Sequence, residues 1–426
     1  MSHLGPGLGL DTAASRRPPA RFFLASAFQL DGAAPTLVAD FARDRHALGG
    51  AQVAASAILT VSSGIKSVLG PSGALVTSPA NAPAYTHRTG RRRLLIEGPA
   101  TNLLTWPADL TQADWAASNA AVTLAAGWSL LRETVNTTFH RVGRDAVTVV
   151  SGATYTVSAL VRRAGRRYLF FRSSLAGGGL NNVTFDLDSG AVVYAHALYT
   201  ARIRQIAADV YLVEASFASL GTSGALYISA APTDPGTGAG SWEGDANLGL
   251  DIRYMQLEAG SAATSLVDGG ASAGSRVADV AQLTSGAAAA LQGAAGSFVW
   301  RGTVRAASAA IQHMIGLPGN FPLLRTRATG VLQMEDGASS LNISGVGAVP
   351  GEIGAAIAWD EAGRAGAVNG GVAASDAVHV TASRASVYLG GYVGLPAGCA
   401  LEIDEIVAWA ARGSGAALTA QARGWA

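Results

Sequence analysis

The stretch Tyr155-Thr-Val-Ser-Ala-Leu-Val-Arg162 decides the fold class. Its apolar side chains occupy every second position, with polar ones between them and Leu160 as the exception, which is typical of a β-strand with one buried face. Residues 183–194 repeat the pattern, and Ser189-Gly190 within them predicts the turn of a β-hairpin. Two more segments alternate in the same way, at 211–217 and at 248–255. The sequence therefore predicts an all-β protein that contains an antiparallel β-sandwich.

Composition limits the class of protein. The chain has 426 residues, of which 49% are hydrophobic and 14% are charged. This hydrophobic share is enough for a large core and excludes a wholly disordered chain. The low charge and the lack of sustained heptads exclude a coiled-coil rod. The 53 glycines follow no Gly-X-Y period, which excludes collagen, and they fit the many turns of short-stranded β domains.

Charge, cysteine content and hydropathy exclude further classes. The net charge of +1 provides no overall field toward nucleic acid or anionic lipid. The single cysteine, Cys399, excludes an internal disulfide and a multi-cysteine metal cluster, and we expect it to be a buried thiol. Residues 1–9 lack the features of a secretory signal, and the longest uncharged run, 47–65, is interrupted by polar residues. We therefore expect a protein made in the cytoplasm, with no membrane insertion and no nucleic-acid partner.

Shifts in composition divide the chain into segments. Residues 1–22 contain Gly, Pro and a small Arg cluster without periodicity, and they are either a frayed end or a flexible arm that docks on a partner. A small β region is expected at 23–104, followed by a first sandwich at 105–270. Residues 271–296 are rich in Ala, Gly and Ser and are expected to be a linker. Residues 297–426 repeat the strand pattern, which predicts a second sandwich.

One stretch resembles a known family. Arg93-Leu-Leu-Ile-Glu-Gly-Pro-Ala-Thr-Asn-Leu-Leu104 is similar to a segment of phage tail-fibre and spike proteins, in which an apolar strand runs into Thr-Asn-Leu-Leu. Other motifs follow in that family's order, namely Asp40-Phe-Ala-Arg-Asp-Arg45, Asp109-Leu-Thr-Gln-Ala-Asp-Trp115, His140-Arg-Val142, Tyr155-Thr-Val-Ser158, Ala164-Gly-Arg-Arg-Tyr168 and Met255-Gln-Leu-Glu-Ala-Gly-Ser261. The C-terminal part resembles concanavalin-A-like lectin sandwiches, at Ile357-Ala-Trp-Asp360, at 363–370 and at 403–409.

This resemblance implies both a fold and a function. Residues 105–270 would form a carbohydrate-binding-like jelly roll, and 297–426 a lectin-like sandwich. The protein would be a tail fibre or head spike on the surface of a virion or phage-like particle, such as a gene transfer agent. Residues 1–22, with 23–104, would attach it to other particle proteins. It would bind a host cell-surface polysaccharide for adsorption, and we expect a homo-oligomer, because weak sugar sites gain avidity when they are repeated.

Catalytic residues are not evident. Glycoside hydrolysis requires two carboxylates about 5–10 Å apart. Three pairs of acids stand two residues apart, namely Asp186 and Asp188, Glu243 and Asp245, and Glu402 and Asp404. In a strand the two members of each pair would lie on one face, about 7 Å apart. Any solvated strand face with two acids shows the same spacing. No Gly-x-Ser-x-Gly motif leads into a helix, and there is no His-x-x-x-His pair. The sequence thus predicts no enzymatic activity, no cofactor and no metal. The lectin resemblance alone suggests a calcium ion near Asp336 or Asp360.

A candidate sugar site lies on a Gly-rich loop at 237–247. Sugar binding requires an aromatic face for the pyranose ring and polar groups for its hydroxyls. The loop supplies Trp242, Glu243, Asp245 and Asn247. Arg166 and Arg167, with Arg172 nearby, are added as partners for an acidic polysaccharide. The alternatives are a Trp242 folded back on the sandwich edge and arginines that line a solvated β-edge. For the protein as a whole, the alternatives are a polysaccharide depolymerase and a spacer without a ligand.

Overall fold

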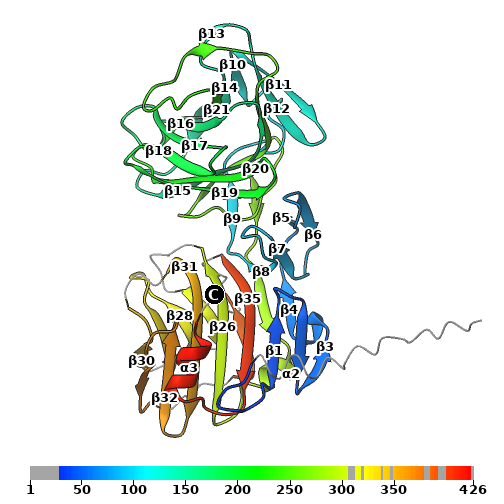
Figure 1. Ribbon diagram of the computed structural model, residues 1–426, viewed down its shortest axis with the longest axis vertical. Coiled ribbons are helices and arrows are strands. Elements are labelled where there is room, and N and C mark those ends of the chain that lie inside the picture. The colour runs from blue at the N-terminus through cyan, green and yellow to red at the C-terminus, as the bar shows by residue number, and fades with distance from the viewer. Residues whose placement is uncertain are drawn as a thin grey trace, which may run out of the picture.

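Two β-sandwiches stacked end to end make up the protein (Figure 1). The computed structural model describes residues 28–305, 312–317, 321–336, 339–345, 349–378, 384–391 and 400–423. Nearly every element in these ranges is a strand, and the strands pair antiparallel, so the prediction of an all-β fold with two antiparallel sandwiches is confirmed. The expected arm at 1–22 and the expected buried thiol of Cys399 lie outside the described residues. No helix in the described ranges is long and apolar enough to cross a membrane.

The first sandwich is a jelly roll of two six-stranded sheets. Its distal sheet, which faces away from the second sandwich, has the order β10 (Ala116–Ser118), β14 (Arg141–Thr148), β21 (Ser223–Ala231), β16 (Tyr168–Ser173), β17 (Asn181–Asp186) and β18 (Ala191–Ala195). Its proximal sheet, which faces the second sandwich, has the order β11 (Ala120–Ala125), β12 (Trp128–Glu133), β23 (Gly249–Ala259), β15 (Thr154–Ala164), β20 (Val210–Ala218) and β19 (Tyr199–Ala207). A two-stranded ribbon of β13 (Thr137–Thr138) and β22 (Trp242–Glu243) lies at the far end.

Alternation along each strand builds the core of the jelly roll. Tyr155, Val157 and Val161 of β15 point between the two sheets, as their spacing predicts. The predicted hairpin is present as β17 and β18, with Gly190 at a φ of 65° in its turn. Glycine adopts that left-handed conformation without a Cβ clash, which explains its position there.

The second sandwich packs a ten-stranded sheet on a seven-stranded one. The larger sheet contains β3 (Ala51–Val53), β2 (Arg45–Leu48), β1 (Leu37–Asp40), β35 (Leu401–Trp409), β26 (Gly296–Val304), β31 (Gly351–Asp360), β32 (Gly363–Val368) and β33 (Ala374–Asp376), with β7 (Ala84–Thr86) and β8 (Arg93–Ile96) joined through β35. The smaller contains β30 (Ser339–Asn342), β29 (Leu332–Asp336), β28 (Phe321–Thr326), β27 (Gln312–Leu317), β34 (Tyr388–Leu389), β25 (Val280–Leu283) and β4 (Leu59–Ser62). Trp300 and Trp359 lie fully buried between the sheets.

The remaining elements are short. They are the 3-10 helix η1 (Ala55–Ala57), the helices α2 (Ser285–Ala289) and α3 (Gly415–Gln421), the hairpin of β5 (Lys66–Leu69) and β6 (Leu75–Ser78), and the pair β9 (Ala100–Asn102) with β24 (Gly274–Arg276). Helix α3 covers the outer face of the ten-stranded sheet, where Leu418 is buried.

Strand pairing divides the chain differently from the expected segments. Residues 23–104 contribute strands to the second sandwich, because β1 pairs with β35 and β4 pairs with β25. Residues 271–296, expected as a linker, include β25 and the helix α2, which pack on the same core. The local sequence predicts the secondary structure of a segment. It does not predict which strand the segment pairs with when that strand is more than 300 residues away, as β35 is from β1.

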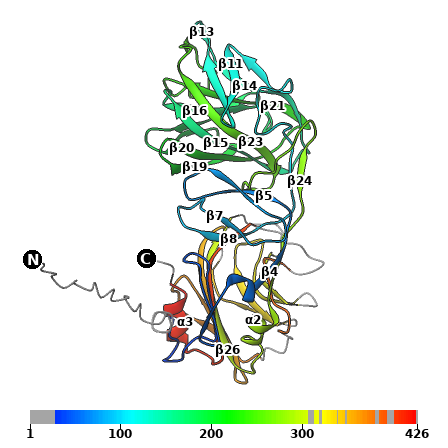
Figure 2. The ribbon, with the colours of Figure 1, turned by 90° about the vertical axis from the view of Figure 1, so that its right-hand side faces the viewer.

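A buried charge network joins the sandwiches where the chain crosses between them (Figure 2). The Glu97 carboxylate accepts hydrogen bonds from the backbone and hydroxyl of Ser265, both at 2.7 Å. It also lies 3.2 Å from Arg276 and 3.5 Å from Lys66, whose ammonium donates to Asp279. Burial alone would raise the pKa of Glu97, but Arg276 and Lys66 lower it to about 2. The network therefore holds an ionised carboxylate out of water.

We expect Glu97→Gln to lower the free energy of unfolding by about 3–5 kcal/mol at pH 7, because it leaves buried cations without their partner. The lowered pKa of Glu97 also means that its stabilising effect is complete above pH 4.5 and is lost as the pH falls toward 2. Denaturant unfolding at several pH values measures both effects. The exposed Glu361→Gln is the matched control, and equal stabilities of the two variants would contradict the role of the network.

Candidate functional site

Two arginines and two aromatic rings form a patch on the outer face of the distal sheet. Arg141 of β14 and Tyr227 of β21 point outward because Val142 and Ile228, their neighbours along the strands, point into the core. The Arg141 guanidinium lies 4.4 Å from the ring centroid of Phe139 and 3.7 Å from that of Tyr227. Arg172 of β16 lies beside Tyr227 in register. We call Phe139, Arg141, Arg172 and Tyr227 the arginine–aromatic patch.

The patch has an excess of positive charge, since the carboxylate of Asp145, which accepts a hydrogen bond from the Tyr227 hydroxyl, faces two arginines. Neither Arg141 nor Arg172 lies within 4.0 Å of a described carboxylate, and Arg172 donates instead to Asn182 Oδ1 at 2.9 Å and to the Thr237 carbonyl at 3.3 Å. Burial and the positive charge of Arg141 lower the pKa of Arg172. Two adjacent guanidinium groups that repel each other favour an anion between them.

The predicted sugar-binding loop borders this patch. The Asn182 side chain donates to the carbonyls of Gly236 and Gly238, at 2.8 Å and 2.5 Å, and so fixes the start of the loop on the distal sheet. The end of the loop is fixed by pairing of β22 with β13. The loop thus lies across the sheet rather than standing away from it.

Trp242 packs against the edge of the sandwich. Its indole N–H donates to Glu133 at 3.0 Å, and its ring lies 5.2 Å from the His140 ring. This position corresponds to the second interpretation of the sequence, a Trp folded back on the edge. The side chain is only half-buried, however, so part of the indole is still accessible.

Glu133 bonds three of the six predicted site residues, and two more lie next to them. Its carboxylate accepts hydrogen bonds from the Arg166 side chain at 2.7 Å and from the Asp245 backbone at 2.9 Å, in addition to the bond from Trp242. Burial would raise the pKa of Glu133, but these donors lower it. Glu243 is exposed next to Trp242, and Asn247 donates to the Asp245 carboxylate at 2.8 Å and 3.0 Å.

The structure does not bring Arg167 to this loop. Arg167 forms an ion pair with Asp186 at 2.7 Å, on the other side of the turn after β15. Arg166 and Arg167 lie in the turn between β15 and β16, where Arg166 bonds Glu133 and Arg167 bonds Asp186. This ion pair and nearby backbone N–H groups hold the pKa of Asp186 well below its usual range.

Sequence reasoning missed Glu133, His140, Arg141 and Tyr227. The polar positions of β12, β14 and β21 were visible as residues that alternate with apolar ones. Their grouping depends on pairings between distant strands, such as Arg141 with Ser229, which no local pattern reports. The aromatic contacts of Arg141 therefore had no signal in the sequence.

The other acid pairs are engaged or buried. Glu402 and Asp404 are buried on the face of β35 opposite the core residues Leu401 and Ile403. Burial raises the pKa of both, and Arg93 lies within 3.7 Å of each. Among the described residues, no three His, Cys, Asp or Glu side chains are grouped to hold a metal ion. Asp360 forms an ion pair with Arg412, and the side chain of Asp336 lies outside what is described, so calcium stays untested.

Comparison with known proteins gives a distant structural likeness. No protein-family model and no curated protein match the chain. The chain is similar to Trypanosoma rangeli sialidase in complex with 2,3-difluoro-KDN, with a TM-score of 0.27 and 11% identity, over 71% of this chain and 62% of the sialidase. Trypanosoma rangeli sialidase itself gives a TM-score of 0.26 and 12% identity, over 71% and 61%. The chain thus spans less than two thirds of these structures.

One prediction from the sequence is corrected by this comparison. The prediction that the protein has no enzymatic activity is withdrawn, since the solved structures to which the chain is similar are those of a sialidase. A likeness with so low a TM-score transfers neither substrate nor catalytic residues to this chain. With no family model matched, the resemblance to phage fibre and spike proteins stays a prediction.

We expect Glu133→Gln to loosen the loop at 237–247, because the loss of a charged acceptor weakens the bonds from Arg166, Trp242 and the Asp245 backbone. A hydrogen bond to a charged group contributes about 1.5–3 kcal/mol, so amide exchange in this loop should be at least about tenfold faster. Hydrogen exchange followed by mass spectrometry measures it, with Glu361→Gln as control. Unchanged protection would show that Glu133 does not position the loop.

Proposed function

We propose that the protein binds an acidic polysaccharide on the distal sheet of its jelly roll. The observation that carries the proposal is the arginine–aromatic patch, where Arg141 and Arg172 lie on the strands either side of β21, each with no described carboxylate within 4.0 Å. Guanidinium groups bind carboxylates and sulfates through paired hydrogen bonds. The half-buried ring of Phe139 beside Arg141 supplies an apolar face on which a pyranose ring stacks, whereas the ring of Tyr227 is buried under Arg141.

The position of the patch suits a long polymer. The distal sheet faces away from the second sandwich, so a chain can approach it without obstruction from that domain (Figure 1). The loop with Trp242, Glu243, Asp245 and Asn247 borders the patch, and its exposed polar groups extend the surface for sugar hydroxyls. We therefore keep these residues and Arg166 as the edge of the proposed site and leave Arg167 out.

We further propose that this polysaccharide belongs to a host cell surface and that the protein is an appendage of a phage or phage-like particle. The support is the ordered set of motifs between Arg93 and Ser261. Within this proposal, residues 1–22 attach the protein to the particle, and several copies together provide avidity.

Binding to purified polymers tests the site. We expect the protein to bind polygalacturonate, alginate or hyaluronan, and to ignore neutral dextran. Arg141→Ala/Arg172→Ala should weaken binding at least about tenfold, because each charged hydrogen bond contributes about 1.5–3 kcal/mol. Arg163→Ala/Arg253→Ala removes the same charge from elsewhere on the jelly roll and serves as control. Binding that is equal in the two double variants, or absent with all three acidic polymers, would overturn the proposal.

The same incubation tests cleavage. Size-exclusion chromatography of the polymer after incubation detects any shortening, and loss of shortening in Glu243→Gln or Asp245→Asn would assign these carboxylates to a depolymerase reaction.

Binding to whole cells tests the biological setting. We expect labelled protein to be retained on capsulated cells of a candidate host and not on capsule-less mutants. Particles built without residues 1–22 should lack the protein. Normal incorporation of the truncated protein would refute attachment through this arm.

A further inference from the structure

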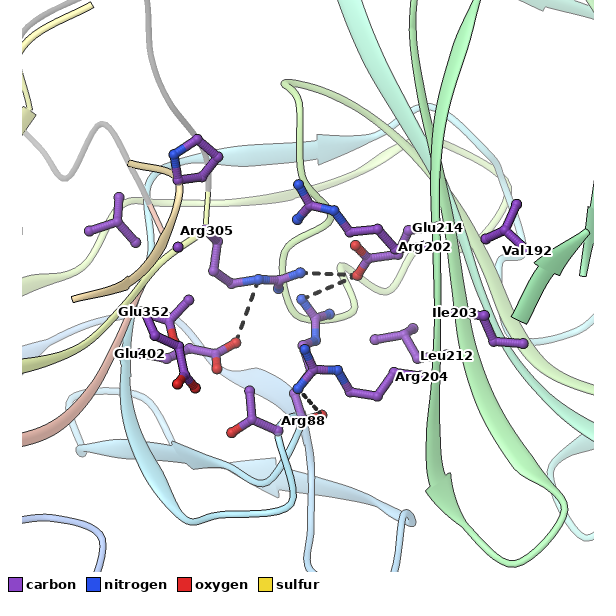
Figure 3. A pocket seen from close by; sticks show the side chains of 15 residues that line it. Arg88, Val192, Arg202, Ile203, Arg204, Leu212, Glu214, Arg305, Glu352 and Glu402 are labelled. Atoms are coloured by element: carbon purple, nitrogen blue, oxygen red, sulfur yellow. Dashed lines mark hydrogen bonds and ion pairs between the residues drawn. The ribbon is translucent and has the colours of Figure 1, made fainter. Parts of the chain in front are cut away.

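A cavity of about 580 Å³ lies between the proximal sheet and the second sandwich (Figure 3). It is far from the arginine–aromatic patch, since the two lie on opposite sides of the jelly roll. One wall comes from β19 and β20, and the other comes from the ends of β26, β31 and β35. Its size falls within the range of about 300–1,000 Å³ that is typical of small-ligand sites.

Two lining arginines are fixed by protein partners. Arg88 donates to the carbonyls of Ala263 and Thr264, at 2.8 Å and 2.9 Å. Arg305 donates to the same Ala263 carbonyl at 2.6 Å and to Glu214 at 3.0 Å. These bonds tie the loop after β7 and the end of β26 to the jelly roll, so this wall is preorganised.

Two other arginines point into the cavity without such partners. Arg202 and Arg204 lie on β19 and alternate with Ile203, which packs on the jelly-roll core, so both extend outward from the sheet. Both are exposed, and neither lies within 4.0 Å of a described carboxylate. Arg204 donates to the Arg88 carbonyl at 3.4 Å. Figure 3 shows Arg202 extending toward Arg305 and Arg204 extending toward Arg88.

The lining carboxylates Glu214, Glu352 and Glu402 compensate these charges only in part, although each of them is attracted by Arg204. Glu214 is opposite Arg202 in register but already bonds Arg305 and lies 3.7 Å from Arg88. Glu352 accepts a hydrogen bond from Arg93 at 2.9 Å. Glu402 lies 3.5 Å from Arg305. The described lining has four arginines and three glutamates, so an excess of positive charge is left, and Arg202 and Arg204 are its exposed members.

We propose that this cavity is a second binding site, which takes a small ligand with a carboxylate, sulfate or phosphate group held between Arg202 and Arg204. Guanidinium pairs recognise such oxyanions bidentately. None of the lining residues is aromatic, so the charged group rather than ring stacking would orient the ligand. Because the walls belong to both sandwiches, a bound ligand would also fix one sandwich against the other.

The proposal differs from polymer binding on the distal sheet, and the test separates the two. Calorimetric titrations use the Arg141→Ala/Arg172→Ala protein as the background, so the distal patch does not contribute. The probes are trigalacturonate, inorganic phosphate and inorganic sulfate at constant ionic strength. The cavity variant adds Arg202→Ala and Arg204→Ala, and the control adds Arg163→Ala and Arg253→Ala to the same background.

We expect at least one probe to bind with a one-to-one stoichiometry and to raise the Tm of the background protein. In the cavity variant the affinity should fall at least about tenfold and the rise in Tm should disappear, whereas the control should match the background. Binding of trigalacturonate alone would identify an acidic sugar unit, and binding of phosphate or sulfate would identify a free anion. No binding of any probe, or equal binding by the cavity variant and the control, would overturn the proposal. The Tm without ligand verifies that the variants are folded.

Discussion

The ionised carboxylate of Glu97, buried at the crossing between the two sandwiches, is the interaction on which the arrangement of the molecule depends. It is surrounded by Arg276, Lys66 and Ser265, and Lys66 is the only lysine of the chain. These partners come from β24, β5 and the segment after β23, so four separate parts of the chain meet at one carboxylate. A charge in this position is tolerated only when every partner is present, because desolvation would otherwise outweigh the attraction. The junction is therefore specific in geometry as well as stable.

The polar residues in the stretch that resembles phage fibre proteins, 93–104, make contacts at or near this junction. Arg93 is buried against Asp404 and Glu352, Glu97 lies in the network above, and the side chain of Asn102 bonds the backbone of Leu104 and Leu257. Each polar residue of the stretch thus has an internal partner, as buried polar groups require. These contacts explain the residues without any ligand. The residues of the motif join the two sandwiches, and the proposed binding surfaces lie elsewhere.

The sequence predicts features that depend on neighbouring residues, and it does not predict pairings between distant strands. Alternation at Tyr155 to Arg162 and the Ser189-Gly190 turn predict strands correctly, because both are properties of neighbouring residues. The division into domains failed at β1 and β25, whose partners depend on packing across the whole chain. The candidate site was also predictable only in part. The loop residues and Arg166 were found from composition, but Glu133, which holds them together, and Arg141, which faces Tyr227, are brought into place by strand pairing.

Charge is scarce in this protein, at 14% of residues, and most of the arginines described are used internally. Against that background the pairs Arg141 with Arg172 and Arg202 with Arg204 stand out, because each places positive charge on a surface without a described carboxylate within 4.0 Å. The two pairs lie on opposite sheets of one jelly roll and differ in shape. The distal pair lies on the outer face of its sheet beside Phe139, which suits an extended polymer, whereas the exposed proximal pair lines a cavity of about 580 Å³, which suits a small charged group. A polymer held on the distal sheet cannot reach the proximal cavity through the packed core between them, so the two surfaces must act on separate ligands or on separate parts of one ligand.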